Sequence, residues 1–286
     1  MPALAKLAAK ILIVVLAGGL LGTALVRLAP GFGVDEEELD VRLSNHSIEA
    51  LRDANTSHES LLGSYGDYLK GLAHGDLGDS RTLQRPVAQL LAERFPETLK
   101  SVGLGLAVGW LFALPLAVAI VMSRAWYLDL VASLMVGLLL CVPAAVLALL
   151  FVVAQAPARL VLGLIVFPKV FRYARNLLSR SAALPHVLTA RAKGLGNFRI
   201  LFWHILPPVL PQLIALCGVT VSLAFTAAIP VEALCDLPGI GQLAWKAAMG
   251  RDVALLVNLT MLVTLVTIVA NSGSDFLARS GARAEA

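Results

Sequence analysis

The chain has 286 residues, of which 58% are hydrophobic, and its mean hydropathy is +0.81. Soluble globular domains are about 45–50% apolar, so the composition excludes a soluble domain and indicates an integral membrane protein. The formal net charge of +4 is unevenly distributed along the chain and gives no indication of nucleic-acid binding. The three cysteines lack the spacing of metal ligands, and we expect them to pack as small apolar residues.

The first apolar segment, residues 11–29, follows Lys6 and Lys10 and is interrupted only by Arg27. A helix needs about 20 apolar residues to cross a bilayer, whereas the apolar core of a cleaved signal peptide has about 7–15. We therefore predict that residues 1–29 form a retained first transmembrane helix whose N-terminus is cytoplasmic.

Residues 30–97 are too polar to span a membrane, because they contain thirteen acidic and six basic residues. We predict an extracytoplasmic segment of helices and loops. At its end, residues 86–95 begin with proline and carry apolar residues on one helical face, as in a short amphipathic helix. We expect this helix to lie along the outer membrane surface and to lead through Pro96 into the next span.

Residues 98–280 are predicted to form a core domain of five transmembrane helices. Pro115 in the second span predicts a kink there, because proline is a common cause of helix kinks. The third span contains Pro143. The fourth span starts at Leu160 but is soon followed by basic residues. The predicted second, third, fifth and sixth spans are residues 101–122, 130–154, 208–229 and 253–277.

Three basic residues, Lys169, Arg172 and Arg175, follow the start of the fourth span at three-residue spacing. This spacing places them on one helical face, and we call them the basic stripe. At about 1.5 Å per residue, Lys169 lies ~14 Å beyond Leu160, near the middle of the bilayer. Charges at that depth face protein or water, and one interpretation is that the stripe lines an inner vestibule. The alternative is that these side chains snorkel to the interface from a tilted helix end. For Lys169 both stay open, and for Arg172 and Arg175 snorkelling is favoured.

Residues 169–204 contain seven lysines and arginines and no acidic residue, which is typical of a cytoplasmic segment. Within it, Gly194 and Gly196 can adopt the positive φ that ends a helix, and Asn197 can cap the next helix. Pro207 is typical of a first helical turn. The sequence therefore predicts a helix, a turn and a return into the membrane over residues 188–207.

Residues 231–252 separate the fifth and sixth spans. The glycines of this segment allow a tight turn, and we predict that it is short and extracytoplasmic. With six spans in all, both termini are cytoplasmic. In chain order the segment contains Glu232, the sequence Leu237-Pro238-Gly239-Ile240-Gly241 and the pair Arg251-Asp252.

Residues 188–207 resemble the EAA loop of bacterial ABC importer permeases. The pattern of that loop is Glu-Ala-Ala, three residues, glycine, nine residues, an aliphatic residue, one residue and Leu-Pro. Counting from Gly194 places the final pair at Leu206 and Pro207, while Leu188 takes the glutamate position and His204 the aliphatic position. The loop sequence at residues 190–195, together with the GDLG and RPV motifs at 75–78 and 85–87, resembles the branch of permeases for oligopeptides, dipeptides and nickel.

This resemblance implies an all-α, polytopic type I importer permease fold with six transmembrane helices in the bacterial inner membrane. The chain would form half of the translocation path, with a second homologous permease as the other half. It would bind two ABC ATPase subunits and an extracytoplasmic substrate-binding protein. ATP and Mg would bind to partner subunits, since the chain has no Walker A sequence. Neither enzymatic chemistry nor a metal or cofactor site is predicted for this chain.

The resemblance also assigns roles to residues. The coupling loop, residues 186–206, would rest on an ATPase subunit, the basic stripe would line the path, and residues 231–252 would form the outer gate and a docking site for the binding protein. The coupling residues would be Ala190, Arg191, Ala192, Lys193, Gly194, Leu195, Phe198, Leu206 and Pro207; the path residues Lys169, Arg172 and Arg175; and the gate or docking residues Glu232, Pro238, Gly239, Gly241, Arg251 and Asp252.

Two other functions stay open from the residues alone. The chain could be half of an ion-coupled secondary transporter, which would carry buried ionisable residues in several spans, or a scaffold subunit without a transport role. Copurification of two ATPases and a second permease would favour the importer. Dipeptides, oligopeptides, metal chelates and nickel all fit the resemblance, because specificity would rest mainly with the binding protein.

Overall fold

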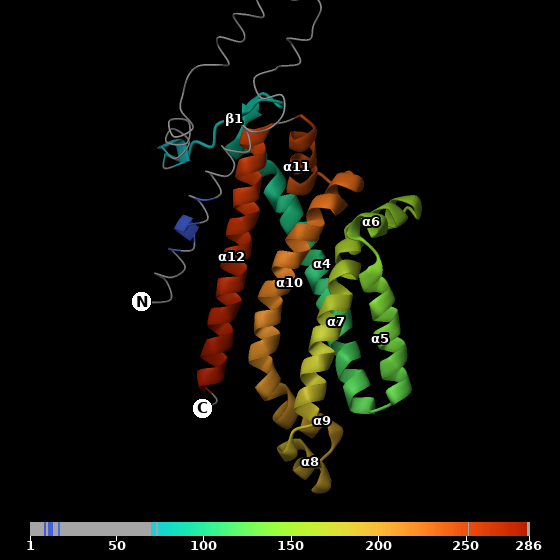
Figure 1. Cartoon of the computed structure of the whole chain (residues 1–286). Coiled ribbons are helices and arrows are strands. Elements are labelled where there is room, and N and C mark those ends of the chain that lie inside the picture. Colours follow the sequence, from blue (N-terminus) through green and yellow to red (C-terminus); the bar gives the residue numbers. More distant parts are fainter. Residues whose placement is uncertain are drawn as a thin grey trace, which may run out of the picture. The chain divides into compact units, whose positions relative to one another are not determined.

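The computed structural model describes residues 70–284 apart from Ala73 and Arg251, together with residues 9, 11–13 and 17. Most of the predicted first span, and residues 30–69 of the predicted extracytoplasmic segment, therefore lie outside the described residues. The described chain is largely helical (Figure 1) and divides into two compact units. Unit 1 comprises Met1–Leu90 and Ala247–Leu262, and unit 2 comprises Leu91–Lys246 and Val263–Ala286.

Unit 1 contains the two short strands of the described chain. β1 (Asp79–Ser80) pairs antiparallel with β2 (Arg85–Pro86), and the connecting turn closes at Gln84, whose φ is 50°. The segment before β1 is joined to the last helix, because the Asn258 amide donates a hydrogen bond of 3.1 Å to the Leu77 carbonyl.

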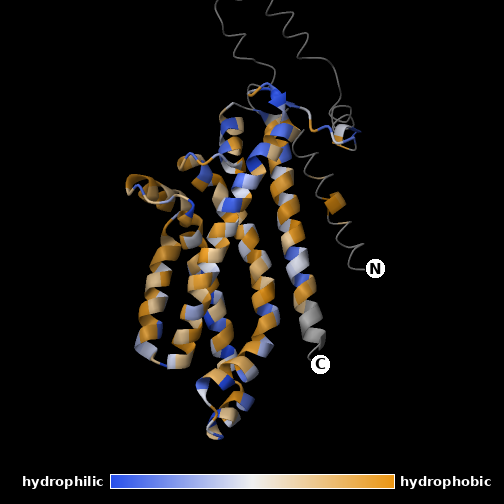
Figure 2. Cartoon of the chain, turned by 180° about the vertical axis from the view of Figure 1, so that it is seen from behind, coloured by the Kyte–Doolittle hydropathy of each residue, from blue (hydrophilic) through white to orange (hydrophobic). Residues whose placement is uncertain are grey.

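Long apolar helices make up most of the chain after β2. Figure 2 shows hydrophobic residues along most of the length of the helices of unit 2, and hydrophilic residues towards both ends, including the loop at residues 186–206. The helical elements are α4 (Val87–Ser123), α5 (Trp126–Cys141), α6 (Ala144–Val153), α7 (Leu160–Ala182), α8 (Pro185–Ala192), α9 (Asn197–Ile200), the π-helix η2 (Leu201–Ile205), α10 (Leu206–Leu234), α11 (Ile240–Met249) and α12 (Val253–Ala284).

Helix α7 forms the centre of unit 2 and packs against α4, α5 and α10. Glycines on α4 allow the closest approach: a Cβ atom added at Gly105 would lie 2.5 Å from the Cβ atom of Leu162, and one added at Gly109 would lie 2.7 Å from Val166. Small residues at a helix contact let two backbones pack closely. Leu162 and Val166 are fully buried, so this seam belongs to the core.

Three described helices are long and apolar enough to cross a membrane, namely Val87–Ser123, Asn197–Leu234 and Ala254–Ala278. They correspond to the predicted second, fifth and sixth spans. The predicted third span is bent by 92° between α5 and α6 and counts as one further span if the pair is taken together. Helix α7, the predicted fourth span, is not among them, since it carries the basic stripe within its length. The count of six spans stays a prediction.

Proline breaks one of these helices and not the others. Pro143 lies in the break between α5 and α6, whereas Pro96 and Pro115 lie inside α4 and Pro168 lies inside α7. The prediction that residues 86–95 form a separate helix ending at Pro96 is therefore wrong, because α4 is continuous from Val87 to Ser123. Long apolar helices tolerate proline when neighbouring groups satisfy the freed carbonyl.

Candidate functional site

The coupling loop has the predicted helix and turn. Helix α8 starts with Pro185 in its first turn and ends at Ala192. Gly194 then adopts a φ of 74°, and its N–H donates to the Arg191 carbonyl at 2.9 Å, which confirms the predicted turn. Gly196 instead has a φ of −65°. Asn197 does not cap the next helix: it is the first residue of α9, and Gly196 holds the cap position without a side-chain bond.

The base of this loop is fixed to the helices on either side. Val187 and Ile200 are almost fully buried, and the Ser181 hydroxyl at the end of α7 donates a hydrogen bond of 2.9 Å to the Ile205 carbonyl. His186 Nε2 lies 3.0 Å from the His204 carbonyl oxygen. The residue at the predicted aliphatic position thus contributes its backbone to the contact, which explains how histidine is accommodated there.

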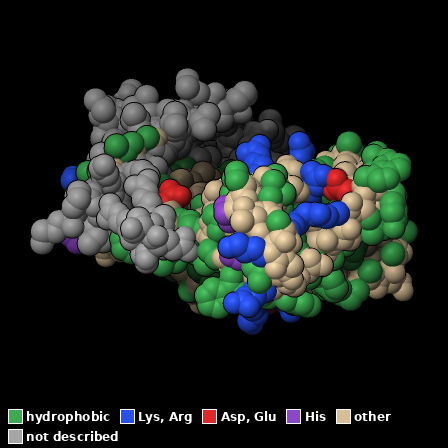
Figure 3. Space-filling model, turned by 90° about the horizontal axis from the view of Figure 1, so that it is seen from below, with side chains coloured by type: hydrophobic (Ala, Val, Ile, Leu, Met, Phe, Trp, Pro, Cys, Tyr) green, Lys and Arg blue, Asp and Glu red, His purple; other side chains and the backbone are tan. Residues whose placement is uncertain are grey.

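The outer face of the loop is apolar and basic. Phe198 is 81% exposed, Phe202 and Trp203 are also exposed, and Lys193 and Arg199 lie on the surface beside them. Figure 3 shows lysine and arginine side chains gathered over this end of the molecule. A cavity of about 750 Å³ is lined by Leu195, Phe198, Arg199, Phe202, Trp203 and His204.

One loop arginine is held differently from its neighbours. Arg191 is half-buried, and its Nε atom is buried without a hydrogen-bond partner among the described residues. A buried donor that lacks an acceptor costs about 1–3 kcal/mol. Arg191 is therefore held by the fold of the loop, whereas Lys193 and Arg199 are exposed.

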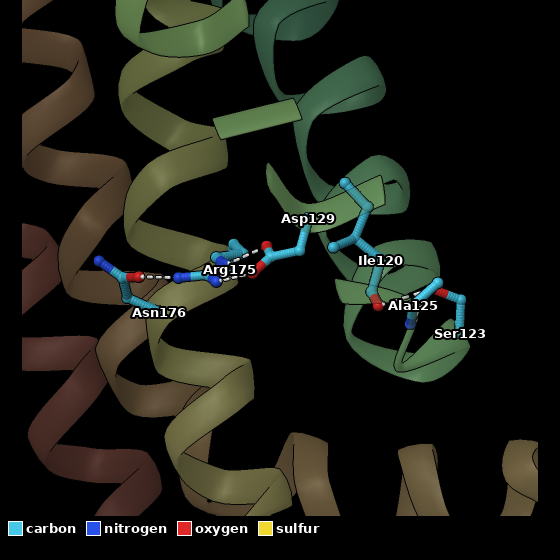
Figure 4. Close-up of polar contacts among 6 residues, drawn as sticks. All are labelled: Ile120, Ser123, Ala125, Asp129, Arg175 and Asn176. Atoms are coloured by element: carbon cyan, nitrogen blue, oxygen red, sulfur yellow. Dashed lines mark hydrogen bonds and ion pairs between the residues drawn. The ribbon is translucent and has the colours of Figure 1, made fainter. Parts of the chain in front are cut away.

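The three residues of the basic stripe differ in their exposure and in their contacts. Lys169 is half-buried and Arg172 is exposed, whereas Arg175 pairs with Asp129 at the start of α5 (Figure 4). Arg175 Nε donates to Asp129 Oδ1 at 2.8 Å, Nη2 donates to Asp129 Oδ2, and Nη1 donates to Asn176 Oδ1 at 3.0 Å. Arg175 is thus held by a forked ion pair between two helices.

Asp129 is a residue that the sequence reasoning missed. It is the only acidic residue between Glu97 and Glu232, a stretch that also contains the whole basic stripe. A lone acid in an apolar helix normally has a partner, because an unpaired charge there is costly. Its isolation was the signal that could have predicted an ion pair with the stripe.

Glu232 is fully buried near the end of α10. Its Oε2 atom accepts hydrogen bonds from the Gly241 N–H at 2.7 Å and from the Thr98 hydroxyl at 3.1 Å. The Thr98 oxygen in turn accepts the Ile240 N–H at 2.8 Å. We call this arrangement the Glu232 turn. It ties the start of α11 to both α4 and α10.

The two glycines of the predicted turn have distinct steric reasons. A Cβ atom at Gly239 would collide with the Glu232 carboxylate, and one at Gly241 would lie 2.6 Å from the Cα atom of Ile229 on α10. Both glycines are buried, whereas Pro238, which precedes Gly239 in the sequence, is exposed. The Pro-Gly-x-Gly sequence is therefore needed for close packing, and Glu232 faces the protein interior.

Asp252 is also buried, within unit 1. Its Oδ2 atom accepts hydrogen bonds from the Ser80 hydroxyl at 2.5 Å and from the Thr82 N–H at 3.1 Å, and Oδ1 accepts the Leu255 N–H at 3.1 Å. Asp252 thus caps the start of α12 and holds the β1–β2 hairpin against it. Its predicted neighbour in the site, Arg251, lies outside the described residues.

Comparison with known proteins assigns the family. A family model described as "Binding-protein-dependent transport system inner membrane component" matches residues 105–283, more than half of the chain. The oligopeptide transport system permease protein OppB of Haemophilus influenzae is 31% identical over 278 residues, which cover 88% of this chain and 89% of that protein. OppB of Escherichia coli K12 is 31% identical over 263 residues, 84% of each chain.

A second kind of relative and a solved structure complete the comparison. The nickel import system permease protein NikB of Staphylococcus aureus is 26% identical over 269 residues, 88% of this chain and 82% of that protein. The inward-facing MetNI methionine ABC transporter contains a chain of similar fold, with a TM-score of 0.60 and 19% identity over 68% of this chain and 96% of that chain. The chain therefore belongs to the family of inner membrane components of binding-protein-dependent transport systems, and is a multi-pass inner-membrane permease subunit of an ABC importer.

Proposed function

We propose that this permease couples to a partner ATPase through the coupling loop and carries peptides across the inner membrane. The observation that carries the proposal is the form of the loop: a buried base, a left-handed turn at Gly194 and an exposed apolar and basic face around Phe198. A rigid base is required, because ATP-driven movement reaches the membrane helices only through contacts whose free energy differs between two states.

The partners of this proposal follow from its geometry and its relatives. A second, homologous permease would complete the path, two ABC ATPases would bind ATP and Mg, and a binding protein would deliver the substrate on the opposite side of the membrane. The ATPase surface that receives the loop would offer an apolar pocket for Phe198 and acidic or carbonyl groups for Arg191, Lys193 and Arg199.

Oligopeptides are the proposed substrate because the relatives at 30–31% identity are oligopeptide permeases. Nickel is the second candidate, on the 26% identity to nickel permeases. Calorimetry of the cognate binding protein against peptides and nickel separates the two. Saturable heat with peptides supports the first candidate, and heat with nickel alone supports the second.

The outer gate would be the Glu232 turn. Its buried carboxylate holds the start of α11 against α4 and α10. A movement of α10 relative to α4 would therefore displace the start of α11. In this proposal Glu232 positions the gate from inside, and exposed neighbours such as Pro238 meet the binding protein.

Two glycines in the loop provide a matched test of coupling. A Cβ atom would meet nothing within 4 Å at either Gly194 or Gly196, but only Gly194 has a positive φ. Gly194→Ala should therefore strain the turn by about 1–2 kcal/mol, and Gly196→Ala should not. We expect G194A to lower ATP-driven uptake several-fold in proteoliposomes and to weaken copurification of the ATPase, and G196A to retain both.

Gly194→Asn refines this test, because asparagine visits the left-handed region more readily than alanine. Uptake by G194N should lie between that of G194A and the wild type. Equal uptake by G194A, G196A and the wild type would remove the loop from the coupling mechanism. An ATPase that copurifies normally with an inactive G194A would place the defect in transmission of movement and not in binding.

A further inference from the structure

A narrow cavity of about 220 Å³ opens between α5 and α7. Its walls are formed on α5 by residues that include Ser133, Gly137 and Leu140, and on α7 by residues that include Phe171, Arg172 and Arg175. We call it the α5–α7 cleft. All of these residues belong to unit 2, and the cleft is separate from both the coupling loop and the Glu232 turn.

The cleft is polar at one end and apolar at the other. Arg175 pairs with Asp129, so this end of α7 lies level with the first turn of α5. Moving along α5 from Ser133 to Leu140 covers about 10 Å at 1.5 Å per residue. Along α5 the lining thus changes from Ser133, near the arginines, to Leu140 over a distance comparable to that between a lipid phosphate and the first part of its acyl chains.

The polar end carries one uncompensated positive charge. Arg175 is neutralised by Asp129, and its remaining contact is with Asn176 (Figure 4). Arg172, one helical turn away, makes no hydrogen bond or ion pair within the described part of the chain. Arg172 is exposed, so its guanidinium is available to an anionic group such as a phosphate. Arg172, Arg175 and Asp129 together carry one net positive charge, which a single negative charge would neutralise.

The surroundings place this charge close to a membrane interface. The α4–α5 turn is closed by the Ser123 hydroxyl, which donates to the Ile120 carbonyl at 2.9 Å and accepts the Ala125 N–H at 3.4 Å (Figure 4). Trp126 and Tyr127 follow and are 76% and 56% exposed, as is typical of aromatic residues at the level of lipid headgroups. Asp129 lies about 4.5 Å further along the helix.

We propose that the α5–α7 cleft binds one anionic phospholipid of the leaflet on the side of the coupling loop. Arg172 and the Ser133 hydroxyl hold its phosphodiester, and an acyl chain lies along Gly137 and Leu140. Basic pockets between membrane helices on this side of a membrane are known to bind anionic headgroups.

The first experiment uses the assembled wild-type transporter. The complex is purified in detergent, incubated with mixed micelles containing equal amounts of phosphatidylglycerol and phosphatidylcholine, and analysed by native mass spectrometry. We expect phosphatidylglycerol to be retained preferentially, and the preference to weaken at high ionic strength because the contact is electrostatic. Equal retention of the two lipids would overturn the proposal. This outcome is independent of whether the transported substrate is a peptide or nickel.

Two pairs of variants locate the site. Arg172→Gln removes the charge, and Arg180→Gln, an exposed arginine on the same helix outside the cleft, controls for charge alone. Gly137→Leu fills the cleft, since a Cβ atom there meets nothing within 4 Å, and Gly103→Leu makes the same change at an equally open glycine on α4. R172Q and G137L should reduce retained phosphatidylglycerol about fivefold or more, and R180Q and G103L should not.

The competing occupant is the transported substrate, with Arg172 on the path. In that case R172Q would lower uptake while phosphatidylglycerol retention stayed at the wild-type level. This pair of results would overturn the lipid site. Loss of phosphatidylglycerol retention in R172Q and G137L, with retention unchanged in R180Q and G103L, would support it.

Discussion

Thr98 serves two chain segments with one hydroxyl group. Its proton goes to Glu232 and its lone pair accepts the Ile240 N–H, and its side chain is fully buried. Thr98→Val keeps the shape but leaves the Ile240 N–H without an acceptor, at a cost of about 1–3 kcal/mol. We expect T98V to lower the Tm of the purified complex, and Thr98→Ser to restore most of it. A T98V complex as stable as the wild type would mean that another group accepts this N–H.

Gly241 gives the second prediction at this scale. An added Cβ atom would lie 2.6 Å from the Cα atom of Ile229 and 2.9 Å from the Ala228 carbonyl oxygen, and backbone atoms of a packed helix cannot move aside cheaply. Gly241→Ala should therefore destabilise the complex by about 1–3 kcal/mol or more, as overpacking does.

Gly103→Ala is the control for Gly241. A Cβ atom added at Gly103 would meet no atom within 4 Å. Gly103 lies within α4, and inside a helix alanine is favoured over glycine by about 0.5–1 kcal/mol. In detergent, the Tm of G241A should therefore lie below that of the wild type, and the Tm of G103A should lie above it. Equal Tm values for G241A and G103A would show that the start of α11 can move away from α10.

Sequence patterns predicted the conformations of single residues unevenly. The positive φ of Gly194 was predicted correctly, because glycine adopts the left-handed conformation that ends a helix more readily than other residues. Asn197 was predicted to cap a helix and instead begins one, since a capping residue and a first-turn residue differ by one position that the sequence does not mark. The sequence also identified Glu232 as important but left open which way its side chain points, and its burial follows from packing by distant residues such as Thr98.

At the scale of helices, the prolines show how far sequence reasoning extends. Pro143 coincides with the sharp break between α5 and α6. Five other prolines lie inside α4, α7 and α10 without ending these helices, namely Pro96, Pro115, Pro168, Pro211 and Pro230. Each of them loses one backbone hydrogen bond, so the outcome depends on whether neighbouring groups keep the segment helical. That information lies in tertiary packing, which is why the helices were predicted more accurately than their bends.

The α5–α7 contact yields a prediction at the same scale. The Asp129–Arg175 pair is only about 30% exposed on either side chain, and α5 has few buried residues of its own. The ion pair should therefore contribute a large share of the α5–α7 contact energy. A double-mutant cycle with Asp129→Asn and Arg175→Gln should give a coupling of about 1 kcal/mol or more.

The double variant in this cycle provides the control. D129N/R175Q removes both charges and can keep an amide contact between the helices, so it should be more stable than R175Q alone, which leaves Asp129 unpaired. The measurement is the Tm of each purified complex in the same detergent. Additive effects of the two single variants would mean that the pair contributes nothing to the packing of α5.

At the scale of the whole molecule, Lys169 tests alternating access. It is half-buried on α7, and in an importer whose path opens inward it should meet water in the resting state. Lys169→Cys should react with a membrane-impermeant thiol reagent in inside-out vesicles without nucleotide. Reaction should slow several-fold when the ATPases are trapped with a non-hydrolysable ATP analogue, because the path then closes on that side.

Arg180→Cys is the matched control for this labelling experiment. Arg180 is exposed near the end of the same helix, so its cysteine should react in both states. Complete protection of K169C in nucleotide-free vesicles would remove Lys169 from the path. Labelling that is equal in the two states would show that this part of α7 does not change its access to water during the cycle.

The π-helix between the loop and α10 determines the direction in which the loop faces. η2 spans Leu201–Ile205, and such a segment holds one residue more than an α-helical turn would. If the same five residues were wound as an ordinary α-helix, everything before them would rotate by roughly a quarter turn around the axis of α10. Phe198 would then point elsewhere although every residue of the loop is unchanged.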